Sequence, residues 1–236
     1  MGVSVIIIGH AGSGKSLLTR NFSRYLLNQG YSVASVNLDP ASPPGYATKA
    51  DIRDFVKTEE VMQKYSLGVN GALLKSMEIG MKHIDDLCIN GEHDFVLYDT
   101  PGQLELFVFT EFGERLVKRI EDHCACVFIA DSSRIKNSSH YSATISQSAT
   151  VSVMLGIPAL TAFNKSDLRE VKDPEYYLRE LKNEGVLGEY FEPLLRFVEI
   201  TSTVYRQIRI SAKTGQGFYD LFTAINEVFC ACGDLS

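Results

Sequence analysis

The sequence predicts an α/β fold of three layers, in which a mostly parallel sheet is covered by helices on both faces. Two observations predict it. Short apolar segments alternate with helix-length amphipathic segments along the 236 residues, which is the pattern of successive strand-helix-strand units. The apolar segments are hydrophobic throughout, as strands buried on both faces are. The chain suffices for one sizeable core rather than two, so we expect a single domain over residues 1–236.

The individual elements follow from the apolar runs and from the turn residues between them. We expect strands at residues 3–8, 32–37, 94–98, 124–130, 159–163 and 207–210. We expect helices at residues 15–28, 51–65, 73–88, 105–121, 141–155, 174–183 and 217–229. Pro40, Pro43, Pro44 and Gly45 exclude a regular helix from residues 39–50, and the glycines at residues 68–71 predict a second break.

Composition and charge exclude several classes of protein. The net charge is −6, and a binder of DNA or RNA phosphates would carry a basic excess, so we expect no direct nucleic-acid binding. No apolar run reaches the ~18 residues that a membrane span needs, and a strand begins at once without a signal peptide before it. We therefore expect a cytoplasmic protein without a membrane anchor.

The five cysteines fit a reducing compartment, because their number is odd and they form no C-x-x-C pair. Cys124 and Cys126 lie in an apolar strand, where small core residues are expected. Cys230 and Cys232 near the C-terminus leave two interpretations open, a metal clip at a subunit boundary or two thiols packed at a helix end.

A glycine-rich motif after the first strand predicts phosphate binding. Residues 9–16, GHAGSGKS, fit G-x-x-x-x-G-K-[ST] between a strand and a helix, so a P-loop NTPase fold is expected. Lys15 would bridge the β- and γ-phosphates, and the Ser16 hydroxyl would bind Mg²⁺. The backbone N–H groups that we expect to surround the phosphates are those of Gly12, Ser13, Gly14, Lys15, Ser16 and Leu17.

Two acidic strand ends predict a magnesium and hydrolysis site beside this loop. Asp99 ends an apolar strand and continues into Thr-Pro-Gly-Gln, where the Gly102 N–H could approach a γ-phosphate and Gln103 could orient the attacking water. Asp39 ends the second strand and could hold Mg²⁺ through water or act as the base. We therefore assign Ser16, Asp39 and Asp99 to the metal, and Asp39, Gln103 and Lys15 to catalysis.

Two further loops predict that the base is guanine. Asn164-Lys165-Ser166-Asp167 follows the fifth strand and fits N-K-x-D. An ionised Asp167 can accept from guanine N1–H and N2–H₂, whereas adenine would present an acceptor to it. The Lys165 stem could lie over the base and Asn164 could tie this loop to the P-loop. A second guanine-side loop is expected at Ser211, Ala212 and Lys213.

Taken together, these motifs resemble those of P-loop GTPases. The chain is similar in particular to the GPN-loop GTPases, and this likeness is carried by residues 37–41 (NLDPA), 51–54 (DIRD), 67–71 (LGVNG) and 99–105 (DTPGQLE). The resemblance covers the chain from its first strand to its last helix. It implies a constitutive homodimer in which residues 39–73, a GPN-loop insertion, reach toward the partner's γ-phosphate, with Asn70 as a catalytic group. It also implies work in assembling or importing RNA polymerase or another client. Residues 168–206 would be a helical insertion.

The sequence departs from the family at the naming motif, which is Gly68-Val69-Asn70 instead of Gly-Pro-Asn. Valine can adopt the φ of about −65° that proline enforces, at a cost of about 0.4–1 kcal/mol through the unfolded chain. Nearby, Asp51 and Asp54 are explained equally well as helix caps or as catalytic acids, and Arg53 is a possible cation for the developing phosphate charge.

Three functions compete on these residues. The first is a dimeric GTPase switch that hydrolyses GTP to GDP and phosphate, with GTP/GDP and Mg²⁺ as cofactors. The second is an assembly scaffold that binds the nucleotide as a structural ligand and hydrolyses it incidentally. The third is a small-molecule P-loop kinase, against which N-K-x-D and the Asp-Thr-Pro-Gly-Gln segment argue.

Overall fold

The computed structural model describes residues 2–121, 123–182 and 207–230, together with residues 185, 189 and 193. Its centre is a parallel sheet of seven strands in the order β3-β2-β4-β1-β5-β6-β7. The strands are β1 Val3–Ile8, β2 Val33–Asn37, β3 Ala50–Asp51, β4 Phe95–Asp99, β5 His123–Asp131, β6 Ala159–Asn164 and β7 Ile208–Arg209. The predicted α/β fold with a parallel sheet is confirmed.

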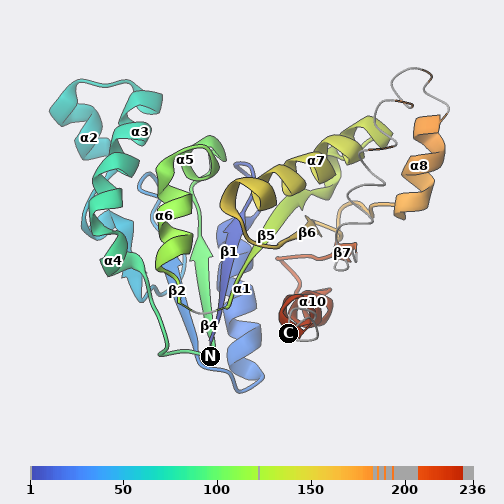
Figure 1. Cartoon of the computed structure of the whole chain (residues 1–236), viewed down its shortest axis with the longest axis horizontal. Coiled ribbons are helices and arrows are strands. Elements are labelled where there is room, and N and C mark those ends of the chain that lie inside the picture. The colour runs from blue at the N-terminus through green and yellow to red at the C-terminus, as the bar shows by residue number, and fades with distance from the viewer. Residues whose placement is uncertain are drawn as a thin grey trace.

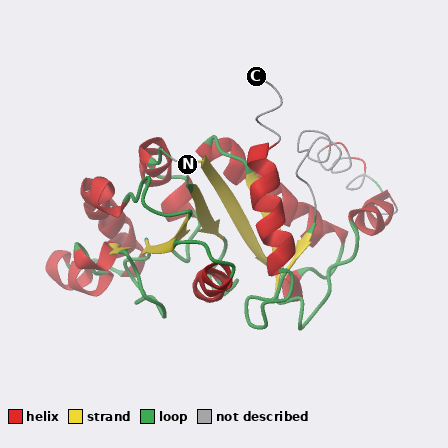
Figure 2. Ribbon diagram, turned by 90° about the horizontal axis from the view of Figure 1, so that it is seen from below, coloured by secondary structure: helices red, strands yellow, loops and turns green. Residues whose placement is uncertain are grey.

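Helices cover both faces of this sheet (Figures 1 and 2). The α-helices are α1 Lys15–Asn28, α2 Thr58–Tyr65, α3 Val69–Gly80, α4 Ile84–Leu87, α5 Glu105–Val108, α6 Glu111–Arg119, α7 Ser138–Leu155, α8 Pro174–Lys182 and α10 Phe218–Cys230. Short 3₁₀ turns lie at Ile52–Asp54, Met81–His83 and Ser132–Arg134. Figure 1 shows α2, α3 and α4 beyond the β2 side of the sheet and α8 beyond the opposite side.

Alternate side chains of each strand enter two separate cores. In β1, Ile6 and Ile8 belong to the core under α3 to α8, whereas Val5 and Ile7 belong to the core under α1 and α10. This division follows from the two-residue period of a strand. Fully burying one such aliphatic side chain contributes about 1.5–3 kcal/mol, so a central strand apolar on both faces anchors the whole fold.

Three of the expected helices are interrupted. The helix expected at residues 51–65 is instead β3, a 3₁₀ turn and α2, because the Asp51 carboxylate accepts from the Arg53 N–H and caps the turn. The helix expected at 105–121 is divided at Thr110, whose side chain accepts from the Phe112 N–H and caps α6. The helix expected at 73–88 breaks at Met81–His83.

The break expected at residues 68–71 is present, but it lies at residues 66–68. The helix α2 ends at Ser66, which has a left-handed φ of 52°, and α3 begins directly after Gly68. Gly68 has an extended backbone and Gly71 lies inside the helix. The naming motif is therefore the N-terminal end of a helix, and the break begins two residues earlier than its glycines suggest.

The expected cysteine positions are borne out where the structure describes them. Cys126 is buried in the first core, and Cys124 packs against it. Burial raises the pKa of the Cys124 thiol to about 12, so it stays a neutral core group. The Cys230 side chain and Cys232 lie outside the described residues, as does most of the segment expected to be a helical insertion. Among the described residues, the helices are too short or too polar to cross a bilayer.

Candidate nucleotide-binding site

The P-loop joins β1 to α1 at the carboxyl end of the sheet, where ligands of open parallel sheets bind. Gly14 adopts a φ of 103° and Gly12 a φ of 76°, which side-chain-bearing residues rarely adopt. A Cβ at Gly14 would also collide with the Asn164 amide. The turn therefore requires glycine at this position for both its backbone and its packing.

Lys15 is buried and folded back onto its own loop. Its Nζ donates to the carbonyl oxygens of Gly9, at 2.8 Å, and His10, at 3.2 Å. Burial lowers the pKa of this ammonium, against the opposing effect of the Asp99 and Asp39 carboxylates. Because its partners are two carbonyls, Lys15 can turn toward phosphate oxygens without leaving a carboxylate unpaired.

The two acidic strand ends meet beside Lys15, as predicted. Asp99 is 2% exposed, and its Oδ2 accepts from the Tyr46 hydroxyl at 2.9 Å. Its Oδ1 is buried and lacks a hydrogen-bond partner in the described part of the chain. Asp39 is held by the Ala41 N–H, which donates to its Oδ1 at 2.9 Å. Burial raises the pKa of both carboxyls. It is opposed in Asp99 by hydrogen bonding from the Ser16 and Tyr46 hydroxyls and by the Lys15 ammonium, and in Asp39 by the Ala41 N–H and Lys15.

These groups fit Mg²⁺. A buried carboxylate oxygen without a partner, a second acid and the exposed Ser16 hydroxyl at the start of α1 are all hard oxygen donors. No group of three or more His, Cys, Asp or Glu side chains in the described residues could hold a metal by itself. Magnesium in nucleotide sites is held by few protein ligands because phosphates and water complete its shell, so this donor set suits it.

Gln103 and Asn70 come together although they are 33 residues apart. The Gln103 Nε2 donates to the Asn70 Oδ1 at 3.4 Å, and both side chains are exposed. Gly102 lies against the P-loop, where a Cβ would touch the Ala11 methyl at 3.4 Å. The predicted catalytic glutamine and the insertion therefore meet at the phosphate end of the site within one chain. The reach of Asn70 toward a partner stays a prediction.

The base-reading loops are tied to the P-loop by one buried amide. The Asn164 Nδ2 donates to the Ser13 carbonyl at 2.7 Å, and its Oδ1 accepts from the Ala212 N–H at 2.8 Å. The predicted tie between Asn164 and the P-loop is therefore present, and it extends to the Ser-Ala-Lys loop. Within that loop, the Ser211 hydroxyl donates to the Asp167 Oδ1 at 2.6 Å, which orients the exposed carboxylate.

Lys165 adopts a left-handed φ of 64°, and its ammonium donates to the Gly12 carbonyl at 2.9 Å and to the Asp131 Oδ2 at 2.6 Å. These contacts fix the stem between the P-loop and the end of β5. Burial acts to raise the pKa of Asp131, but its bonds with Lys165 and Ser133 outweigh this and lower it. Lys213 is exposed and Leu17 is half-buried beside this site.

The insertion contributes two residues whose contacts are structural in this arrangement, Asp51 and Arg53. The Asp51 Oδ1 accepts from the Asn37 amide at 2.8 Å and caps the following turn. Arg53 donates to the Pro40 carbonyl at 2.9 Å and lies 3.8 Å from Glu59. Capping thus describes what Asp51 does here, and Arg53 secures the loop that carries Asp39.

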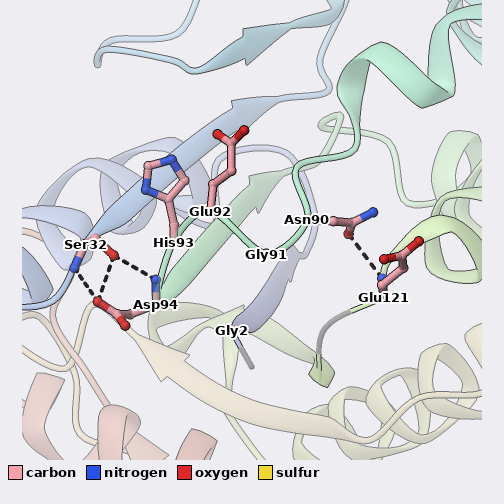
Figure 3. Close-up of a pocket in the computed structure, with 8 residues that line it drawn as sticks. All are labelled: Gly2, Ser32, Asn90, Gly91, Glu92, His93, Asp94 and Glu121. Atoms are coloured by element: carbon pink, nitrogen blue, oxygen red, sulfur yellow. Dashed lines mark hydrogen bonds between the residues drawn. The ribbon is translucent and has the colours of Figure 1, made fainter.

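A separate cavity of about 430 Å³ lies at the opposite, amino-terminal ends of the strands (Figure 3). Its lining includes Glu92, Asp94 and Glu121. Figure 3 shows Asp94 turned toward Ser32 and Asn90 turned toward Glu121. Because its charged walls are acidic, this cavity would repel phosphates, and the nucleotide site is the one at the P-loop.

Sequence reasoning missed two polar residues of the site. Tyr46 lies in the proline-rich loop after β2, where no periodicity indicates the direction of a side chain. Asn37 ends β2 next to Asp39 and reaches Asp51 across the sheet edge. Its position at the carboxyl end of a strand was the signal that could have identified it.

Comparison with known proteins decides between the possible P-loop classes. The model of a family described as "Conserved hypothetical ATP binding protein" matches residues 7–231. The chain is 34% identical to the GPN-loop GTPase PAB0955 of Pyrococcus abyssi, over 98% of this chain and 99% of that one. This chain belongs to the GPN-loop GTPases.

Further similarities agree with this membership. GPN-loop GTPase 3 of Candida glabrata is 31% identical over 76% of this chain and 68% of its own length. The crystal structure of PAB0955, a GTPase in apo form, superposes with a TM-score of 0.85 and 32% identity over 98% of both chains. As a GPN-loop GTPase, the chain is a GTP-binding enzyme of the P-loop class. The guanine preference agrees with its N-K-x-D loop rather than with the ATP in the family description.

Proposed function

We propose that this GPN-loop GTPase hydrolyses GTP to GDP and phosphate in a magnesium-dependent reaction at the P-loop. The observation that carries the proposal is the buried Asn164 amide, bonded to Ser13 on one side and to Ala212 on the other. It joins the phosphate cradle and the two guanine-side loops into one connected site. The nucleotide would extend from Asp167 at the base end to Ser16 at the phosphate end.

The residues divide the work between binding and charge stabilisation. Lys15 would leave the Gly9 and His10 carbonyls for the β- and γ-phosphate oxygens. The groups that would hold Mg²⁺ are Ser16, Asp39 and Asp99, and the bound ion supplies neutralisation of the phosphate charge. The Gly102 N–H, close to the P-loop, adds a donor toward the γ-phosphate. These groups stabilise the charge that develops on the transferred phosphoryl oxygens.

Water would be positioned by polar side chains at the same end. Gln103 can hold the attacking water with its carbonyl oxygen while its amide stays bonded to Asn70. Asp39 interacts with Lys15 at the phosphate end, and burial raises its pKa, so as an alternative to binding Mg²⁺ through water it would accept a proton from the attacking water. The contact between Asn70 and Gln103 supports a role for the insertion in this step.

The base assignment is tested by the substitution Asp167→Asn. The amide can pair with xanthine but presents a donor to the guanine N1–H or N2–H₂, so GTP affinity should fall by at least about 100-fold while xanthosine triphosphate gains affinity. Titration with fluorescent nucleotides measures both. The control is Asp173→Asn, which removes the same charge from an exposed residue bonded to Arg209. Unchanged GTP affinity in Asp167→Asn would refute the assignment.

We further propose that the protein is a cytoplasmic homodimer that acts as a switch, with an assembly client such as RNA polymerase. Exposed apolar residues near the phosphate end, among them Val69 and Leu74 on α3 and Phe109 after α5, support a contact surface there. Sedimentation mass with GDP, with a GTP analogue and without nucleotide tests the dimer, and a monomer in all three states contradicts it. Client assembly by a GTP-bound variant that does not hydrolyse would favour the scaffold over the switch.

A further inference from the structure

Asp99 is held by a hydrogen bond that the hydrolysis mechanism does not use. The Tyr46 hydroxyl donates to its Oδ2 at 2.9 Å, while its Oδ1 is buried and lacks a partner among the described residues. The two residues come from different segments, Tyr46 from the loop after β2 and Asp99 from the end of β4. Tyr46 thus fixes one oxygen of a buried carboxylate that also interacts with the neighbouring Ser16 hydroxyl, and Oδ1 is left without a close hydrogen-bond partner in the described part of the chain.

The surroundings of Tyr46 keep its hydroxyl a donor. Burial raises its pKa, and the Asp99, Asp51 and Asp39 carboxylates around it raise it further. The phenol is therefore a neutral hydrogen-bond donor to Asp99. A neutral donor among three acids can orient a carboxylate without neutralising it, which a lysine at the same place would do.

We propose that Tyr46 is a positioning residue for the metal, which sets the Asp99 carboxylate so that its Oδ1 remains free to face Mg²⁺. This inference rests on the proposed function, which places the ion at Ser16, Asp39 and Asp99. A carboxylate whose Oδ2 accepts from Tyr46 cannot rotate about its axis without breaking that bond. Outer partners of this kind contribute about 10- to 100-fold to metal affinity, because they orient the ligand before the metal arrives.

The same bond joins the two acidic strand ends. Asp39 and Tyr46 lie on the same loop after β2. Arg53, which follows this loop, also holds it by donating to the Pro40 carbonyl. Fixing Tyr46 to Asp99 therefore also fixes the distance between the loop that carries Asp39 and the end of β4. Removing the Tyr46 hydroxyl should weaken metal binding while leaving the guanine-binding loops unchanged.

The test uses Tyr46→Phe, which keeps the ring and removes only the hydroxyl. Electron paramagnetic resonance of free Mn²⁺ gives the affinity of the ion for the full-length protein saturated with GDP. We expect the Mn²⁺ dissociation constant to rise about 10-fold. In steady-state assays the half-saturating Mg²⁺ concentration should rise by a similar factor, with kcat at saturating Mg²⁺ within about threefold.

The matched control is Tyr98→Phe. Tyr98 precedes Asp99 on β4 and is fully buried, but its hydroxyl accepts from the Ile89 N–H at 3.1 Å, away from the site. Its loss should leave Mn²⁺ affinity within twofold. Asp99→Asn provides the reference for a lost metal ligand.

The outcomes separate this inference from the proposed function. If Tyr46→Phe binds Mn²⁺ as the unmodified protein does while Asp99→Asn binds it weakly, the role of Tyr46 is refuted and the magnesium site stands. If Asp99→Asn also retains full affinity, both are refuted. GDP affinity measured in excess chelator reports on the site without metal. If Tyr46→Phe lowers this metal-free GDP affinity by more than about threefold, Tyr46 supports the fold of the site rather than the metal, and the inference is overturned.

Discussion

Replacing Asn164 by alanine tests the connection on which the nucleotide site depends. The side chain is 2% exposed and makes two short hydrogen bonds, to the Ser13 carbonyl and from the Ala212 N–H. Alanine would leave one buried acceptor and one buried donor unpaired, at about 1–3 kcal/mol each. The expected total is about 2–6 kcal/mol.

This free energy can be lost in two ways, and both are measurable. If the loops stay ordered without their amide, the free energy of unfolding of the nucleotide-free protein falls by the full amount. If the loops relax into solvent, the nucleotide must reorder them, and GDP affinity falls by about 30-fold or more for a cost of 2 kcal/mol. Urea unfolding and a fluorescent-GDP titration together give the sum, which should be at least about 2 kcal/mol.

Asn90 offers a matched control at the opposite end of the sheet (Figure 3). Its amide also makes two bonds to the backbone, donating to the Arg119 carbonyl at 3.0 Å and accepting from the Glu121 N–H at 3.1 Å. Because water can replace both of these exposed bonds, Asn90→Ala should cost under about 1 kcal/mol and leave GDP affinity unchanged. The reasoning fails if Asn164→Ala changes stability by less than about 0.5 kcal/mol and GDP affinity by less than threefold.

Two further predictions concern the phosphate end. Gln103→Ala should retain GTP affinity and slow turnover about 100-fold, because only the orientation of the water is lost; the control is Gln63→Ala on the exposed face of α2, and normal hydrolysis would remove Gln103 from the mechanism. Burial raises the pKa of Asp99 and Asp39 above the unfolded values, so their charged forms destabilise the nucleotide-free fold. The free energy of unfolding therefore increases as the pH falls through the raised pKa values, and this gain is lost as the pH rises again. Asp99→Asn should therefore raise the Tm of the nucleotide-free protein at neutral pH, by about 2–4 °C per kcal/mol, while weakening Mn²⁺ binding; a lower Tm in scanning calorimetry would contradict this.

The sequence predicted the parts of the site that lie in contiguous motifs or at strand ends. Gly14, Lys15 and Asn164 are identified by spacing, since each motif follows an apolar strand directly. Asp39 and Asp99 are identified by topology, because the carboxyl ends of neighbouring parallel strands meet at one edge of the sheet. In both cases the backbone alone determines where the side chain lies.

Tyr46 could not be predicted, because its position depends on the path of an irregular loop. Residues 38–49 contain three prolines and no strand or helix, so no periodicity relates Tyr46 to Asp99, which is 53 residues away. The division between α5 and α6 was missed for a related reason. The apolar residues continue from Val108 through Phe109 to Phe112 with a single polar pair between them, and only the Thr110 side chain, which caps the start of α6, marks the division.

The structure also explains why valine can replace proline in the motif that names the family. Val69 is the first residue of α3, directly after Gly68, whose carbonyl accepts from the Ala72 N–H at 2.9 Å. Proline is favoured at the first position of a helix, because its fixed φ suits the helix and its missing N–H would have no partner inside the helix. Valine in the same position adopts the same backbone and adds an N–H that water can satisfy, since Val69 is 57% exposed. The shape that presents Asn70 to Gln103 is therefore set by the helix itself, and proline contributes only the unfolded-state restraint of about 0.4–1 kcal/mol.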